Sequence, residues 1–153
     1  DNLVLIHDPK RNRKKEISTE NLGRIVIFGD VQLTISCIQN TLKKGIPVTP
    51  GTCTPTDVEK ALTFGLDVVK FFPAEPAGGL NFIKAIAAPY VGLKFMPTGG
   101  INANNVRDYL KYDRIIACGG SWMVKGDLIK AGDFEKIKKL TAEAAKIVKE
   151  IRG

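Results

Sequence analysis

Histidine and cysteine are scarce in this 153-residue chain, which has one histidine, His7, and three cysteines. A histidine-rich metal centre is therefore excluded, as is a catalytic triad that needs a histidine away from the N-terminus. The cysteines Cys37, Cys53 and Cys118 form an odd set without a CxxC pair, which argues against a disulfide framework and against a zinc site. We expect reduced thiols that are buried or half-buried.

Long apolar runs are also missing, and the chain opens with a charged residue. No stretch has the pattern of a membrane span, a signal peptide or a transit peptide, so we expect a cytoplasmic protein with no membrane partner. Hydrophobic residues make up 44% and charged residues 25%, which is enough to bury a core. With no low-complexity linker, the length predicts a single β/α domain over 1–153 and is short for a complete eight-unit β/α barrel.

Positive charge is concentrated in one place. The net charge is +7, and residues 10–15 carry five basic side chains; elsewhere 18 basic residues face 16 acidic ones. Neither aromatic stacking residues nor a basic recognition helix accompanies this run, so nucleic acid is not an expected partner. We interpret the run as a solvated loop, with contact to an anionic ligand as the alternative.

From Arg24 onward, short runs rich in Val, Ile and Phe alternate with turns and amphipathic stretches. This repetition predicts parallel βα units over 24–153, preceded by an atypical segment over 1–23. Two fold classes remain open: a TIM-barrel type, for which these units fall short of the usual eight or so, and an open doubly wound, flavodoxin-like sheet. The predicted strands are 3–6, 25–29, 46–50, 67–72, 93–97 and 115–118.

Capping residues mark the helices between these strands. Asp30 can begin a helix over 31–44, Thr54 precedes a proline at the first helical position, and Asn102 can begin a further helix. The last helix begins at Asp133. Its apolar residues recur every three or four positions and predict a stripe that packs on the sheet: Phe134, Ile137, Leu140, Ala144, Ile147, Val148 and Ile151.

Lys70 lies inside the apolar run Val68-Val69-Lys70-Phe71-Phe72, which should be a buried strand. Burial disfavours the charged form of an amine, and a neutral amine is a nucleophile toward carbonyls. Lys70 is therefore a candidate Schiff-base lysine. The alternative is a lysine that reaches water from the polar side of an edge strand.

Two glycine pairs close consecutive predicted strands, and each precedes a predicted helix. Gly99-Gly100 and Gly119-Gly120 leave backbone N–H groups accessible, so together they predict a phosphate site to which Ser121 adds a hydroxyl. Thr98 is placed to contact a substrate carboxylate or carbonyl, or to form a turn. Glu75 follows the Lys70 strand and is a candidate acid or base, with an exposed loop carboxylate as the alternative.

Three motifs carry a family resemblance: VVKFFPAE with its following GG, KFMPTGGIN and ACGGSWMV. Together they resemble the 2-keto-3-deoxy-6-phosphogluconate (KDPG) aldolases, which also cleave 4-hydroxy-2-oxoglutarate. The similarity is close over 46–153 and loose over 25–45.

The resemblance implies a barrel fold, a homotrimer and a lyase that needs neither metal nor organic cofactor. It implies that Lys70 condenses with the ketone, that Thr98 contacts the substrate, and that both glycine pairs with Ser121 bind phosphate. The resulting imine would act as an electron sink for cleavage into pyruvate and glyceraldehyde 3-phosphate.

The first part of the chain departs from that pattern. The family's early strands carry a glutamate base and a carboxylate-binding arginine; here only Glu16-Ile17-Ser18 resembles the glutamate motif, and no arginine follows at the right distance. Gly29-Asp30 stands where the family usually has proline and glycine. The sequence is therefore also consistent with an aldolase fragment, a chimera, or a diverged module that binds phosphorylated ligands without catalysis.

Overall fold

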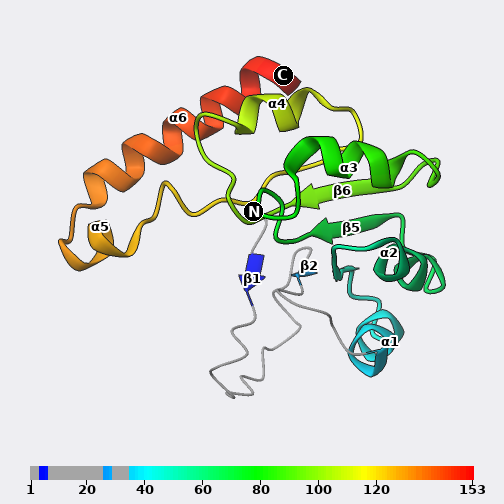
Figure 1. Ribbon diagram of the computed structural model, residues 1–153. Helices are drawn as coiled ribbons and strands as arrows, with labels where there is room; N and C mark the ends of the chain where they lie inside the picture. Colours follow the sequence, from blue (N-terminus) through cyan, green and yellow to red (C-terminus); the bar gives the residue numbers. More distant parts are fainter. Residues whose placement is uncertain (1–3, 7–25, 29–34) are drawn as a thin grey trace. The chain divides into compact units, whose positions relative to one another are not determined.

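The computed structural model describes residues 4–6, 26–28 and 35–153, and these form parallel βα units (Figure 1). The chain divides into two compact units, residues 1–72 and 73–153. The basic run 10–15, His7, Glu16, the predicted cap Asp30 and the rest of segment 1–23 beyond 4–6 lie outside the described residues. The single domain over 1–153 stays a prediction.

The described residues of the first unit form five short strands and two helices. Strands β1 (Val4–Ile6), β2 (Val26–Phe28) and β3 (Val48–Thr49) form a parallel sheet, and β4 (Gly51–Thr52) pairs in parallel with β5 (Val68–Phe71). Helix α1 spans Ile35–Lys43 and α2 spans Pro55–Leu62. The parallel pairing expected from the repeated pattern is confirmed.

Thr54 begins α2 as the sequence predicts. Its hydroxyl accepts from the Asp57 N–H, and the Asp57 carboxylate accepts from the Thr54 N–H at 2.9 Å, which completes a capping box. Pro55 follows at the first helical position, where a missing N–H costs nothing. Val58 and Ala61 then form the buried face.

The second unit contains β6 (Lys94–Pro97) and helices α3 (Gly79–Ala87), α4 (Val106–Lys111), α5 (Gly126–Lys130) and α6 (Phe134–Arg152). Within the predicted strand 115–118 only Ile115 forms a bridge, in parallel with Phe95; a second parallel bridge joins Thr98 to Gly119, just beyond that range. Asn102 does not cap α4, because the N-cap residue of that helix is Asn105. The side-chain amide oxygen of Asn102 accepts instead from the Asn104 N–H.

The last helix is confirmed, but the expected burial of its apolar stripe is not found. The Asp133 carboxylate caps α6 through the Lys136 N–H, yet no α6 residue is buried. The helix contacts α4 and α5, and Figure 1 shows it extending beyond the short α4. Arg107 and Glu150 form a 2.8 Å ion pair between α4 and α6. These two short helices cover only part of a 19-residue helix, so its stripe keeps considerable exposure.

The described residues do not form a complete barrel. None of the helices in the described ranges is long and apolar enough to cross a membrane.

Candidate active site

Lys70 lies in the middle of β5 and is 4% exposed. Its N–H donates to the Pro50 carbonyl at 3.0 Å, and its own carbonyl accepts from the Thr52 hydroxyl at 3.0 Å. The side-chain nitrogen lies 5.2 Å from the centroid of the Phe72 ring, within the range of a cation–π contact. The expected burial of Lys70 is confirmed, whereas its role in condensation stays a prediction.

Thr98 follows β6 in the second unit and pairs with Gly119. The Gly119 N–H donates to the Pro97 carbonyl at 2.9 Å, which brings the two loops into register. The Thr98 hydroxyl oxygen is buried and has no hydrogen-bond partner in the described part of the chain. Leaving a buried hydroxyl unpaired is costly, and Thr49 shares this feature; the contact of Thr98 with a substrate stays a prediction.

The two glycine pairs sit in loops, and neither is directly followed by a helix. Helices α4 and α5 begin at Val106 and Gly126, several residues beyond each pair, which corrects the expected helix N-termini. The spacing arises because residues 101–105 and 121–125 form turns first. An anion at these loops would therefore be bound by loop N–H groups rather than by a helix end. Ser121 is exposed beside the second pair.

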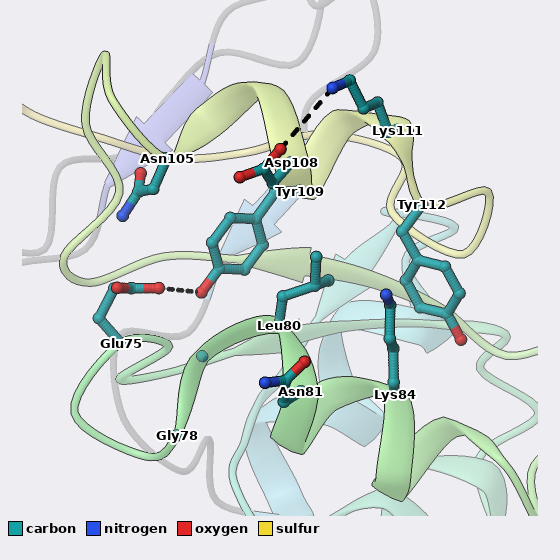
Figure 2. A pocket seen from close by; sticks show the side chains of 11 residues that line it. Glu75, Gly78, Leu80, Asn81, Lys84, Asn105, Asp108, Tyr109, Lys111 and Tyr112 are labelled. Atoms are coloured by element: carbon teal, nitrogen blue, oxygen red, sulfur yellow. Dashed lines mark hydrogen bonds and ion pairs between the residues drawn. The ribbon is translucent and has the colours of Figure 1, made fainter.

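Glu75 is exposed overall, yet its carboxylate accepts a hydrogen bond from the Tyr109 hydroxyl of α4. Figure 2 shows the two side chains pointing toward one another across a pocket of about 640 Å³ between α3 and α4. Burial raises the pKa of Tyr109, and the hydrogen bond to Glu75 and its charge raise it further. The phenol therefore stays protonated and keeps donating. A proton-transfer role for Glu75 stays a prediction.

The structure thus brings most predicted residues together within one unit. Thr98, Glu75 and both glycine pairs belong to residues 73–153, whereas Lys70 belongs to residues 1–72.

Cys53 and Cys118 are free and half-buried, as expected, while the Cys37 side chain lies outside the description. Burial raises the pKa of the Cys118 thiol to about 11, against a smaller lowering by Arg152. In the ranges that the structure covers, no group of three or more His, Cys, Asp or Glu side chains could hold a metal ion.

Sequence reasoning missed Tyr109. Its position in the helix gave a signal, because Val106, Tyr109 and Leu110 share the buried face of α4. A buried phenol needs a hydrogen-bond partner, and that requirement predicts a polar group facing it. The sequence does not identify the partner as Glu75, which lies 34 residues earlier.

The sequence model of the family "Aldolase: KDPG and KHG aldolase" matches residues 29–140. The chain belongs to this family. A 2-dehydro-3-deoxy-phosphogluconate aldolase of Treponema pallidum is 46% identical over 111 residues, covering 72% of this chain and 53% of the relative. The Haemophilus influenzae enzyme of the same name is 48% identical over 103 residues, covering 67% and 49%. The chain therefore spans about half the length of these relatives.

Solved structures of KDPG aldolases are similar to this chain and are likewise covered by it only in part. The Legionella pneumophila enzyme, with pyruvate captured at low pH as a covalent carbinolamine intermediate, matches with a TM-score of 0.71 and 35% identity, covering 75% of this chain and 55% of that one. The Zymomonas mobilis enzyme with 3-phosphoglycerate matches with a TM-score of 0.69 and 35% identity, covering 79% and 55%. These neighbours and the parallel βα units confirm an α/β aldolase fold.

Proposed function

We propose that this chain is a Schiff-base lyase that cleaves 2-keto-3-deoxy-6-phosphogluconate to pyruvate and glyceraldehyde 3-phosphate. The observation that carries the proposal is a buried strand lysine, Lys70, in a chain of the KDPG and KHG aldolase family. The chain corresponds to about half of its relatives, and we propose that it lacks the first strands of their barrel.

Lys70 supplies the covalent step. Its neutral amine adds to the C2 ketone to give a carbinolamine, and loss of water gives the iminium ion. The captured pyruvate adduct of the Legionella relative is the same type of intermediate. A base then takes the proton of the C4 hydroxyl, the C3–C4 bond breaks, and its electron pair moves into the iminium to form an enamine. Glyceraldehyde 3-phosphate leaves, and protonation at C3 followed by addition of water releases pyruvate and regenerates the amine.

The second unit supplies recognition. We assign the substrate carboxylate or carbonyl to the unpaired hydroxyl of Thr98, and the phosphate to Gly99-Gly100 and Gly119-Gly120 with Ser121. Glu75 is the predicted proton shuttle among the described residues. The 3-phosphoglycerate bound by the Zymomonas relative is a phosphorylated acid of comparable chemistry. No metal or organic cofactor is required by this mechanism, and we further propose a cytoplasmic homotrimer.

The test is release of pyruvate from 2-keto-3-deoxy-6-phosphogluconate, followed by a coupled dehydrogenase. Lys70→Arg should abolish it, because a guanidinium stays protonated and does not condense. Lys84→Arg is the matched control, since Lys84 lies on α3 with its ammonium 5.5 Å from the centroid of the Tyr112 ring. Release that survives Lys70→Arg would contradict the proposal.

A further inference from the structure

Glu75 lies directly against the backbone of Gly100. A Cβ at position 100 would be 2.5 Å from the Glu75 Cβ and 3.7 Å from its Cα. Gly100 also has a backbone φ of +86°, a conformation that residues with a Cβ rarely adopt. The close approach of Glu75 to this loop therefore depends on glycine, and it ties the side chain of one loop to the backbone of another.

The carboxylate of Glu75 lies close to a second glycine, Gly79. A Cβ at Gly79 would be 3.1 Å from Glu75 Oε1 and 3.3 Å from the Tyr109 hydroxyl oxygen. Gly79 begins α3 with a φ of +66°, and Tyr109 is 2% exposed. The hydrogen bond between carboxylate and phenol is thus built into the space between α3 and α4.

Backbone hydrogen bonds join the same two loops. The N–H of Ala74 donates to the Thr98 carbonyl at 2.8 Å, and that of Glu75 donates to the Gly99 carbonyl at 3.0 Å. On its other side, the Gly100 carbonyl accepts from the side-chain amides of Asn102 at 3.0 Å and Asn105 at 3.1 Å. The Gly99-Gly100 backbone is consequently fixed from the Glu75 loop and from the residues leading into α4.

The hydrogen bond from Tyr109 also determines where the carboxylate of Glu75 points. A carboxylate near an anion-binding loop would repel the anion if it were free to turn toward it. In Figure 2 the Glu75 carboxylate points at Tyr109, and the phenol holds it toward α4. A protonated phenol can do this throughout the neutral range because it loses no proton there.

We propose that Glu75 and Tyr109 are positioning residues that fix the Gly99-Gly100 backbone for the phosphate group of the substrate. The inference rests on the proposed function, because it takes these glycines as part of the phosphate site. It differs from proton transfer by Glu75 in a way that substitutions separate. Positioning needs a hydrogen-bond acceptor at residue 75 and a donor at residue 109, whereas proton transfer needs a titratable group at residue 75 alone.

The experiment is a titration of the full chain with inorganic phosphate, followed by the backbone amide signals of the two glycine pairs in ¹H–¹⁵N NMR spectra. Tyr109→Phe and Glu75→Ala should each weaken phosphate binding about tenfold, the loss expected for one hydrogen bond to a charged group. Glu75→Gln keeps an acceptor for the Tyr109 hydroxyl and should retain most of the affinity. Tyr112→Phe, a matched change in the same pocket, should leave affinity unchanged.

Trapping of pyruvate by borohydride is measured on the same samples, because pyruvate has no phosphate. It should be equal in the wild type, Tyr109→Phe and Tyr112→Phe, which also shows that the variants are folded. Wild-type phosphate affinity in Tyr109→Phe would overturn the inference, as would a wild type that traps pyruvate but binds no phosphate. Phosphate binding with the predicted losses but no trapping would instead overturn the proposed aldolase function alone.

Discussion

Gly119 lies so close to Thr98 that a Cβ at position 119 would be 2.5 Å from the Thr98 Cγ2 atom. The bridge between these residues leaves no room for a methyl group, so the bare Cα of Gly119 sets the position of the Thr98 side chain. The second glycine pair therefore positions Thr98, the proposed substrate contact, as well as forming part of the proposed phosphate loop.

Gly119→Ala is expected to displace Thr98. Overpacking of this kind typically costs about 1–3 kcal/mol of unfolding free energy. We expect half-maximal pyruvate trapping to need roughly tenfold more pyruvate, on the order of one lost hydrogen bond. Gly126→Ala is the control, because nothing lies within 4 Å of a Cβ there. Equal pyruvate dependence in both variants would show that Thr98 does not contact the keto acid.

Thr98→Val should separate stability from binding. Removing a buried hydroxyl that has no partner is expected to raise the free energy of unfolding by about 1 kcal/mol. The same change should weaken pyruvate binding if that hydroxyl contacts the ligand. Thr49→Val is the matched comparison, since its hydroxyl is also buried without a partner in the described structure. A loss of stability in Thr98→Val, measured by urea unfolding, would contradict this account.

Cys118 should resist alkylation at neutral pH. With a pKa of about 11 instead of the ordinary 9.0, only about one thiol in a thousand is ionised at pH 8, roughly a hundredfold fewer than normal. Between pH 9 and 11 the unfolded chain loses the proton while the folded chain keeps it, so the free energy of unfolding should fall as pH rises. Cys118→Ser should remove that part of the slope. A slope unchanged by the substitution would mean that the thiol is not shielded from water.

The local elements were predictable because their signals are local. The capping box at Thr54 and the apolar run around Lys70 locate α2 and β5 within a few residues. The strand expected over 115–118 forms only one bridge, because hydrophobic periodicity does not show how many backbone partners a segment finds. The exposed stripe of α6 has the same cause, since amphipathicity predicts a face to be covered but not how much neighbouring structure covers it.

The sequence likewise predicts some features of the candidate site and not others. Residue type and position at the ends of strands predict Lys70, Thr98 and the glycine pairs as site residues, and the structure shows where they lie. The Glu75–Tyr109 contact joins the loop before α3 to helix α4 at one pocket, a tertiary relationship that the spacing of two residues does not contain.

We expect this chain to form the imine but to cleave the carbon–carbon bond slowly. In the proposed mechanism condensation needs Lys70, whereas cleavage also needs a placed base, and such a base typically contributes about 10² to 10⁴ in rate. We therefore expect trapping of pyruvate together with cleavage of 2-keto-3-deoxy-6-phosphogluconate that is slower, by about that factor, than in the relatives. Single-turnover measurements on both reactions check this. Turnover equal to that of a relative would place an efficient base within this chain, and substitutions at Glu16, Glu75 and His7 would locate it.

If Lys70 is the condensing amine, pyruvate can be trapped on it by reduction. The chain is incubated with pyruvate and borohydride, digested, and mapped by mass spectrometry, with Lys70→Arg and Lys84→Arg treated alongside. We expect one reduced adduct, on Lys70, which is lost in Lys70→Arg and kept in Lys84→Arg. No adduct, or adducts spread over exposed lysines such as Lys111, would contradict it.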